Sequence, residues 1–387
     1  GGFQSVKYRQ IGLTKEKVSA LGFGCMRLPT LDRKPSSGEV DEPETIRMLR
    51  YAIDNGVNYI DTAYTYHNGK SEEVIGRTLQ DGYREKVLLT TKMPIWLVEK
   101  SSDFDRFLHE QLSRLKTDSL DIYLLHNLKK ETYHHLLKLG IFSWAEKAID
   151  KGLFRYFGFS CHEPFSIFKD FIDSYDRWSI TQIQYNYMNE DVQAGTKGLK
   201  YAAEKEIGVV IMEPLLGGTL ANPHPEILSL LNQANPQRSP VDWALQWLWN
   251  KPEISTVLSG MNSFEQVQQN INSANHSGAN SLRSEELDTI SKVQSKYSSM
   301  NPIPCTKCGY CMPCPNQVDI PRNFELFNTA MVFNQVNLNR NIYQNIFPEE
   351  MHASSCIQCG ICEEKCPQNI PIRDWLIKIE KALGRKD

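Results

Sequence analysis

Short apolar runs alternate with helix-like segments eight times along the first 275 residues, and this alternation constrains the fold more than any other feature. The apolar runs are nearly continuous, as in parallel strands that are buried on both faces. They cover residues 18–25, 57–61, 87–92, 120–125, 154–160, 179–184, 208–213 and 255–260. The segments between them place apolar residues at helical spacing and cover residues 44–55, 71–79, 103–115, 133–150, 163–173, 191–206, 241–250 and 263–275. Eight strand–helix units predict an α/β fold of the (β/α)8 TIM barrel type.

A doubly wound parallel sheet is the rival arrangement, because it also alternates strands with helices. Such a sheet usually carries a glycine-rich phosphate loop between its first strand and first helix. Here Gly22 and Gly24 are followed by a long polar loop without a third glycine, so the pattern favours the barrel. Residues 3–17 precede the first strand, and we expect them to form a small hairpin that turns near Gly12.

Three successive strands end in titratable residues, namely Asp61, Lys92 and His126, and Tyr66 follows Asp61 in the next loop. In a (β/α)8 barrel the carboxyl ends of the strands meet at one face, where active sites lie. We therefore expect the four side chains to share one cavity. Taken singly, each has an ordinary explanation, such as a helix cap, a solvated lysine or a structural histidine.

Together the four residues form a proton-transfer set. A phenol has a reference pKa of about 10, and a nearby ammonium group lowers that pKa because it stabilises the phenolate. We expect Lys92 to act on Tyr66 in this way, Asp61 to keep Lys92 charged, and His126 to be a second hydrogen-bond partner. Tyr66 could then protonate a carbonyl oxygen while a hydride reaches the carbon, which is carbonyl reduction.

The motifs around these residues resemble those of the aldo-keto reductase family, over about the first 275 residues. They are Leu21-Gly22-Phe23-Gly24, Asp61-Thr62-Ala63-Tyr64-Thr65-Tyr66, Thr91-Lys92 and Asp121-Ile122-Tyr123-Leu124-Leu125-His126. The resemblance implies a barrel that binds a nicotinamide dinucleotide without a Rossmann domain. It also implies that Tyr66 is the proton donor and that Lys92, Asp61 and His126 support it.

The resemblance implies contacts to the nicotinamide cofactor as well. Ser160 and Gln182 match residues that hold the carboxamide. Met212 stands where the family commonly has a tyrosine stacked on the ring, and a methionine can cover a ring by soft packing. Gln269 and Asn270 lie in a stretch that resembles the adenosine-binding segment and could hydrogen-bond adenine.

Two departures from the family pattern stand out. Cys161 follows Ser160 where the family commonly has asparagine, and we expect it to be a buried, inert thiol. Residues 259–270 contain no lysine or arginine, although a 2′-phosphate is best held by such residues. The choice between NADPH and NADH therefore stays open.

Eight of the ten cysteines lie after residue 300, in two clusters. The clusters are Cys305, Cys308, Cys311 and Cys314, and Cys356, Cys359, Cys362 and Cys366. The second cluster matches the bacterial ferredoxin spacing, in which the last cysteine, before proline, ligates the other iron–sulfur cluster. Structural zinc is the alternative, but runs of three evenly spaced cysteines followed by Cys-Pro fit two [4Fe-4S] clusters better. Crossed ligation would join Cys366 to the first three cysteines and Cys314 to the later three.

These patterns predict two domains. Residues 3–297 are expected to form the barrel, residues 298–304 a linker, and residues 305–384 a small, mainly helical, ferredoxin-like domain. The 41 residues between the two cysteine clusters exceed the connection in a compact ferredoxin and contain a helix-like apolar run. So small a domain would need its clusters in order to fold.

Composition narrows the function further. A net charge of −3 without a basic stripe argues against a nucleic-acid partner, and no apolar run is long enough to span a membrane. We expect a cytoplasmic oxidoreductase that acts on a small carbonyl or alcohol substrate and exchanges electrons with a possible redox partner protein. Hydride transfer moves two electrons, whereas a cluster carries one, so structural or sensory clusters are an alternative. A non-catalytic barrel that senses nicotinamide and docks a partner is a second alternative.

Overall fold

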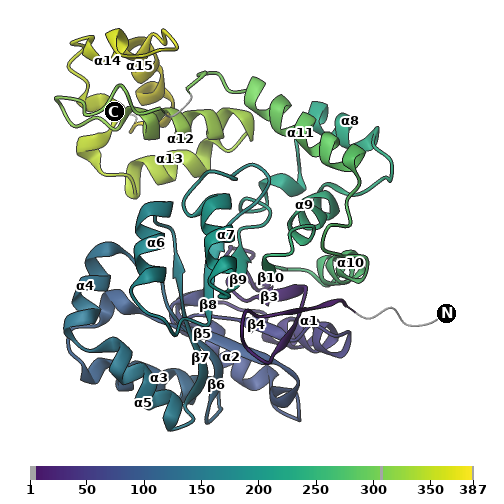
Figure 1. Ribbon diagram of the computed structural model, residues 1–387. Helices are drawn as coiled ribbons and strands as arrows, with labels where there is room; N and C mark the ends of the chain where they lie inside the picture. The colour runs from purple at the N-terminus through teal and green to yellow at the C-terminus, as the bar shows by residue number, and fades with distance from the viewer. Residues whose placement is uncertain (1–5, 306–307, 386–387) are drawn as a thin grey trace. The chain divides into compact units, whose positions relative to one another are not determined.

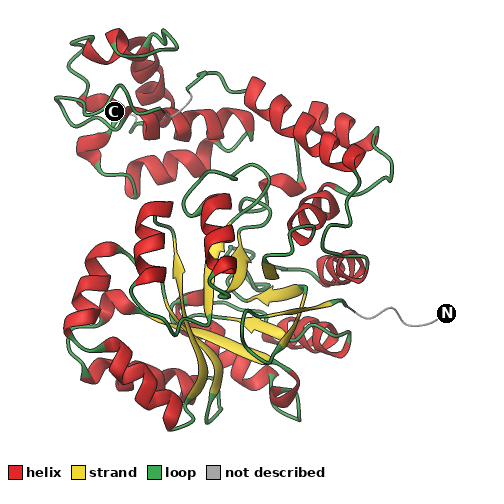
Figure 2. Cartoon of the chain, in the orientation of Figure 1, coloured by secondary structure: helices red, strands yellow, loops and turns green. Residues whose placement is uncertain are grey.

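The computed structural model of the chain describes residues 6–305 and 308–385 (Figure 1). Eight parallel strands close into a barrel in the order β10-β3-β4-β5-β6-β7-β8-β9. The strands are β3 (Leu21–Gly24), β4 (Tyr59–Asp61), β5 (Leu88–Met93), β6 (Leu120–Leu125), β7 (Phe154–Cys161), β8 (Ile180–Gln184), β9 (Gly208–Met212) and β10 (Ile254–Ser259). Helices lie outside these strands (Figure 2). The predicted TIM barrel is confirmed.

Helices follow the strands in the expected alternation. The barrel helices are α1 (Glu42–Asp54), α2 (Lys70–Thr78), α3 (Ser102–Arg114), α4 (Lys130–Lys138), α5 (Ile141–Asp150), α6 (Phe165–Asp173), α7 (Gly195–Glu204), α9 (Pro240–Trp249) and α10 (Phe264–Asn275). Short 3-10 turns include η1 (Tyr66–Gly69), η2 (Arg84–Lys86), η3 (Ile95–Leu97) and η4 (Thr219–Ala221). Helix α10 begins where the sequence predicts, because the side chain of Ser263 caps it by accepting a hydrogen bond from Gln266 N.

Three details differ from the sequence-based expectation. The segment 133–150 forms two helices, α4 and α5, because Gly140 between them takes a left-handed conformation with φ of +77°. The first barrel strand begins at Leu21, because residues 17–19 pair with the preceding strand instead. Helix α8 (Pro225–Asn232) was not predicted, although His224 and Pro225 form an ordinary helix start.

A hairpin of β1 (Tyr8–Gln10) and β2 (Lys17–Ser19) covers the amino-terminal end of the barrel. Its residues Ile11 and Val18 are fully buried in the same apolar cluster as barrel residues such as Tyr59 and Ile122. At the turn, Gly12 has a φ of +44°, and a Cβ there would lie 2.3 Å from the carbonyl oxygen of Glu206. With this end covered by the hairpin, the carboxyl ends of the strands form the other end of the barrel, where a site is expected.

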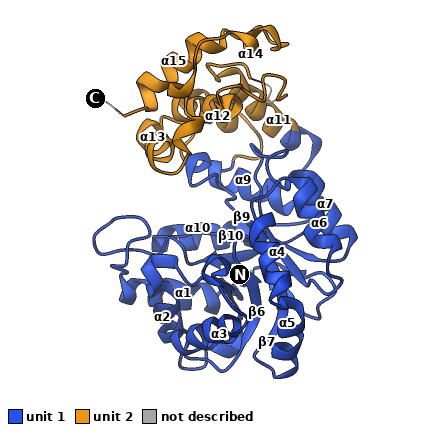
Figure 3. Cartoon of the chain, turned by 90° about the vertical axis from the view of Figure 1, so that its left-hand side faces the viewer, with its two compact units in different colours: residues 1–221, 238–287 blue, residues 222–237, 288–387 orange. Residues whose placement is uncertain are grey.

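The chain divides into two compact units, residues 1–221 with 238–287, and residues 222–237 with 288–387 (Figure 3). The second unit holds α8, most of α11 (Ser284–Ser299), and then α12 (Ile320–Val332), α13 (Val336–Asn345), η5 (Glu349–Met351), η6 (Ala353–Ser355), α14 (Ile361–Glu364) and α15 (Ile372–Leu383). It has its own apolar core, which includes Phe324, Tyr343 and Leu376. The domain limits expected from the sequence stay a prediction. No helix in the described part of the chain is long and apolar enough to cross a membrane.

Candidate active site and cysteine clusters

Asp61 and Lys92 form a buried ion pair at the carboxyl ends of two neighbouring strands. Asp61 ends β4, Lys92 lies near the end of β5, and the two strands pair in parallel. The Nζ atom of Lys92 donates to Asp61 Oδ1 at 2.7 Å and to the carbonyl oxygen of Thr62 at 2.9 Å. The side chains are only 1% and 3% exposed. A buried ammonium group with two such acceptors is held in one position.

Tyr66 reaches the same ammonium group from η1, the turn after β4. Lys92 Nζ lies 3.2 Å from the phenol oxygen of Tyr66 and donates to it. The turn is shaped by His67 and Asn68, which both take left-handed conformations, and His67 Nε2 accepts a hydrogen bond from Leu28 N at 3.0 Å. The structure thus brings Tyr66, Lys92 and Asp61 together as the strand ends predicted.

Lys92 lowers the pKa of the Tyr66 phenol as predicted, but burial has the larger effect. Burial raises the pKa of Tyr66, and although Lys92 acts to lower it, the pKa stays above the ordinary value. Burial also raises the pKa of Asp61 against the opposing effect of Lys92. For Lys92, burial alone would lower the pKa, but Asp61 and Tyr66 outweigh it and raise the pKa. Tyr66 is therefore a neutral phenol next to a charged lysine at neutral pH.

His126 follows β6 and packs against Tyr66. Its ring meets that of Tyr66 edge to face, with centroids 5.9 Å apart, and lies 5.2 Å from the ring of Trp96. The contact is between the rings, not the hydrogen bond expected from the sequence. Burial, with a smaller effect of Lys92, lowers the pKa of His126 to about 3, so the imidazole is neutral. Its Nδ1 atom is buried and has no hydrogen-bond partner among the described residues.

Three neighbouring strands carry Ser160, Gln182 and Met212: Ser160 lies near the end of β7, Gln182 lies in the middle of β8, and Met212 ends β9. Ser160 pairs with Gln182 in the strand register, and Gln182 Nε2 lies 3.7 Å from the Met212 sulfur. Ser160 Oγ accepts a hydrogen bond from Asn127 N at 2.8 Å. The Oε1 atom of Gln182 is buried without a partner in the described part of the chain. A ligand amide could donate to this oxygen, so the residues fit a carboxamide.

The predicted adenine-binding residues already have partners. Asn270 is buried in α10, where its Nδ2 donates to Ser259 Oγ at 2.9 Å. Gln269 is exposed and donates to Glu265 Oε1 at 2.9 Å. Asn270 thus joins α10 to the end of β10.

One basic residue near this segment, Arg27, carried no signal in the sequence. A Cβ at Gly260 would lie 3.5 Å from the side chain of Arg27, which comes from the loop after β3. Arg27 Nη1 donates to the carbonyl oxygen of Gly217 at 3.3 Å, and Nη2 lies 3.7 Å from Glu213 Oε1. The segment 259–270 therefore has a basic neighbour that no local motif could reveal.

Cys161, the other departure from the family pattern, is buried as expected. Burial raises the pKa of its thiol to about 12, so it is protonated and unreactive at neutral pH.

The eight clustered cysteines surround two hollows in the second unit. One hollow is lined by Cys305, Cys308, Cys311 and Cys366. The other is lined by Cys311, Cys314, Cys356, Cys359 and Cys362. Each hollow therefore combines cysteines from both clusters, and Cys311 borders both. Among the described residues, no group of three or more Cys, His, Asp or Glu side chains is set to hold a single metal ion.

Comparison with known families agrees with this arrangement. Residues 20–294 match the aldo/keto reductase family and residues 304–370 match the 4Fe-4S dicluster domain. The first match covers more than half of the chain, so the chain belongs to the aldo/keto reductase family, a class of oxidoreductases. These matches confirm the predicted enzyme class, an NAD(P)-dependent oxidoreductase of the aldo-keto reductase type joined to an iron–sulfur domain.

Several individual proteins are similar to the barrel part. L-galactose dehydrogenase of Arabidopsis thaliana is 27% identical over 288 residues, which cover 69% of this chain and 87% of that protein. The holo form of aldo-keto reductase AKR11C1 from Bacillus halodurans is 27% identical, with a TM-score of 0.61 over 74% of this chain and 96% of the other. An aldo-keto reductase from Klebsiella pneumoniae in complex with NADPH, 24% identical with a TM-score of 0.59, covers 75% of this chain and 95% of its own and shares the fold.

Proposed function

We propose that the barrel reduces the carbonyl group of a small molecule to an alcohol, or catalyses the reverse reaction, with Tyr66 as proton donor. One observation carries the proposal. The Lys92 ammonium group lies 3.2 Å from the phenol oxygen of Tyr66 while Asp61 holds it at 2.7 Å. This geometry suits a phenol that gives up a proton beside a fixed positive charge.

Each group at the site has its own role in the proposed reaction. A bound nicotinamide supplies or accepts the hydride. Tyr66 transfers its proton to the carbonyl oxygen, and Lys92 stabilises the phenolate that remains. Because burial raises the pKa of Tyr66, the phenol starts protonated at neutral pH, as reduction requires. The pKa of His126 is lowered to about 3, so its imidazole packs against Tyr66 as a neutral, polar group and adds no charge beside Lys92.

Ser160, Gln182 and Met212 are proposed to hold the nicotinamide. The partnerless, buried Oε1 atom of Gln182 would accept a hydrogen bond from the carboxamide, and Met212 would lie against the ring. Arg27, beside Gly217 and Gly260, is a candidate for the phosphates of NADPH or NADH. Gln269 and Asn270 remain proposed neighbours of the adenosine end.

The second unit is proposed to hold two [4Fe-4S] clusters with crossed ligation. Cys305, Cys308 and Cys311 would share one cluster with Cys366, while Cys356, Cys359 and Cys362 would share the other with Cys314. The linings of the two hollows support this division. We propose that these clusters exchange electrons with a redox partner protein.

A structural role for the clusters is the second candidate. Six of the cysteines pack against the apolar core of the unit, namely Cys305, Cys311, Cys314, Cys356, Cys362 and Cys366. A cluster bound there would complete that core. The non-catalytic alternative receives less support, because the residues for proton transfer are assembled.

Oxidation of NADPH and NADH with a panel of aldehydes and ketones tests the barrel proposal. We expect Tyr66→Phe to lower kcat by roughly 10²- to 10⁴-fold, because it removes the proton but keeps the ring. Turnover that is unaffected by this change would overturn the assignment of the proton donor.

Iron analysis of anaerobically purified protein tests the cluster proposal. We expect about eight irons per chain, the content of two cubane clusters, with broad visible absorption. Stoichiometric zinc without iron would contradict it.

A further inference from the structure

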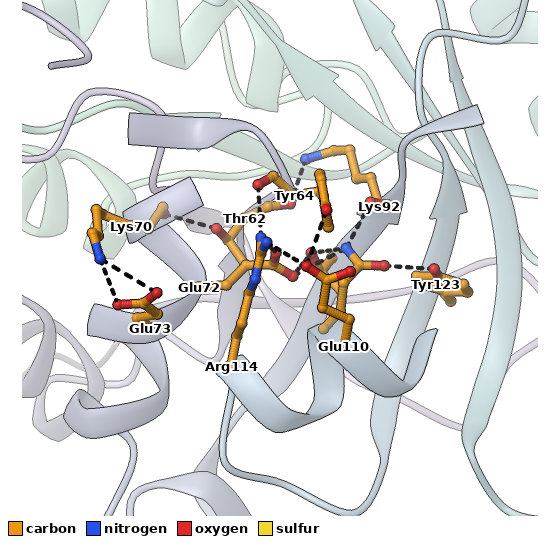
Figure 4. A network of polar contacts seen from close by, with 12 residues as sticks. Thr62, Tyr64, Lys70, Glu72, Glu73, Lys92, Glu110, Arg114 and Tyr123 are labelled. Atoms are coloured by element: carbon orange, nitrogen blue, oxygen red, sulfur yellow. Dashed lines mark hydrogen bonds and ion pairs between the residues drawn. The ribbon is translucent and has the colours of Figure 1, made fainter. Parts of the chain in front are cut away.

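A buried polar network lies behind Lys92, on the side of β5 that faces the helices (Figure 4). Side chains alternate along a strand, so Lys92 points into the barrel while its neighbour Thr91 points outward. There Thr91 meets Glu72 of α2 and Gln111 of α3. Thr91, Glu72 and Gln111 have no part in the proton transfer proposed for Tyr66.

Glu72 is the centre of the network. Its side chain is fully buried, and its Oε2 atom accepts hydrogen bonds from Thr91 Oγ1 at 2.9 Å and from Gln111 Nε2 at 3.0 Å. Its Oε1 atom accepts from Arg114 Nη1 at 3.3 Å. Both carboxylate oxygens are thus occupied by donors from β5 and α3.

Gln111 connects the network to the backbone of Lys92. Its Nε2 atom lies 2.8 Å from the carbonyl oxygen of Lys92 and donates to it. Its Oε1 atom accepts from the phenol of Tyr123 on β6 at 2.6 Å. The amide of Gln111 therefore ties β5 at Lys92 to the neighbouring strand and to α3.

Arg114 connects the same network to the loop that carries Tyr66. Its Nη1 atom also donates to the carbonyl oxygen of Tyr64 at 3.2 Å, two residues before Tyr66. Its Nη2 atom donates to Glu110 Oε1 at 2.6 Å, and the guanidinium lies over the Tyr64 ring at 4.2 Å. Arg114 thus fixes the backbone of this loop relative to α3.

A buried carboxylate such as that of Glu72 is an unusual residue in a protein core. Burial of a charge is destabilising unless the charge is paired, and apolar residues of similar size often serve packing as well or better. Here burial raises the pKa of Glu72 to about 7, against the opposing effects of Thr91 and Arg114. The partners of Glu72 are donors that also bond the backbone at Lys92 and Tyr64, so the network connects the two segments that meet at the proposed site.

We infer that Glu72, Gln111 and Arg114 are positioning residues that set the distance between the Lys92 ammonium group and the Tyr66 phenol. They do so by fixing β5 and the loop after β4 to one buried carboxylate. This role rests on the proposed function of Lys92 and Tyr66. It assigns to α2 and α3 a part in catalysis without contact with the substrate.

Glu72→Gln tests the inference, because an amide cannot accept from both Thr91 and Gln111 with one atom and from Arg114 with the other. We expect kcat to fall roughly 10- to 100-fold with KM for the carbonyl substrate unchanged. The matched control is Glu286→Gln. Glu286 is also a buried carboxylate in the barrel unit, with its side chain 3% exposed and paired with Arg238 at 2.7 Å, but it does not contact the site. The Glu286→Gln variant should keep the wild-type kcat.

The pH profile separates positioning from mere stability. Tyr66 faces Lys92, Asp61, Cys25 and His126, and only Lys92 lowers the pKa of the phenol. If Lys92 moves away, this pKa rises, so the alkaline limb of kcat should shift to higher pH in Glu72→Gln. A limb at the wild-type position with kcat equal to that of Glu286→Gln would overturn the inference.

Two conservative variants complete the test. Glu72→Asp keeps the charge but is too short to reach all three donors, and Arg114→Lys keeps the charge but cannot serve Glu72, Tyr64 and Glu110 together. We expect both to lower kcat by less than Glu72→Gln does. Wild-type kcat in both would contradict the inference. Tyr66→Phe, assayed alongside, distinguishes failure of the positioning role from failure of the proposed function. Full activity in that variant would reject the proposed function itself.

Discussion

The barrel site and the cysteine-lined hollows of the second unit differ in what holds their side chains in place. At the strand ends, Lys92 is fixed by Asp61, Thr62 and Tyr66 through contacts within the protein. In the second unit, the cysteines border hollows that their own side chains do not fill. Contacts within the protein organise the first centre, whereas the second is proposed to depend on the iron–sulfur clusters that its cysteines would hold.

Removal of iron should give the largest effect and sharpen this comparison. A small core that packs against cluster ligands depends on the clusters for its stability. We expect chelation under oxidising conditions to unfold the second unit, seen as rapid proteolysis within residues 305–384, while the barrel keeps its circular dichroism. Equal protection of both units after iron loss would contradict the dependence of the second unit on its clusters.

Lys92→Met breaks the barrel centre and leaves the iron in place. It removes the charge beside Tyr66 and leaves Asp61 as an unpaired buried carboxylate, so we expect kcat to fall roughly 10²- to 10⁴-fold and stability to drop by about 3–5 kcal/mol. Lys70→Met is the control, because the Lys70 side chain is half exposed and pairs with Glu73 on the same helix. Carbonyl reduction, thermal unfolding and iron content are the measurements, and wild-type turnover in Lys92→Met would refute its role.

The sequence was sufficient to predict the barrel and the proximity of Asp61, Tyr66, Lys92 and His126, because both follow from where the strands end. The catalytic role of these residues stays a prediction. The sequence was insufficient to predict pKa values that depend on burial and contacts between residues far apart in the chain. The net rise in the pKa of Tyr66 depends on desolvation, which no local motif encodes. Arg27 meets Gly260 only after the barrel closes, and Glu72 looks like an ordinary acidic residue in the first turn of a helix.

The acid side of the stability profile should reveal the burial of His126. Its pKa is lowered to about 3 in the folded protein, against about 6.5 in the unfolded chain. The unfolded state therefore binds the proton first, and the free energy of unfolding should fall as pH falls from 6.5 toward 3. We expect His126→Phe, which cannot bind a proton, to flatten this dependence in urea titrations of the barrel. An unchanged slope would contradict the burial of a neutral imidazole.

A smaller effect is expected from one charge beside a hollow of the second unit. Arg373 lines the hollow of Cys314, Cys356, Cys359 and Cys362 and pairs with Glu363 at 2.8 Å. A nearby cation favours the more negative, reduced state of a cluster, so Arg373→Gln should lower one reduction potential by on the order of tens of millivolts. Arg322→Gln is the control, because Arg322 pairs with Glu325 and does not line either hollow. Redox titration followed by electron paramagnetic resonance measures both, and equal potentials in Arg373→Gln and wild type would contradict this charge effect.

The role of Tyr66 is tested most directly by measuring kcat for carbonyl reduction in Tyr66→Phe protein that carries its full iron content. We expect turnover to fall by roughly 10²- to 10⁴-fold while nicotinamide binding and the visible absorption of the clusters stay at wild-type values. Turnover at the wild-type rate in this variant would contradict the claim that the phenol held beside Lys92 gives the proton.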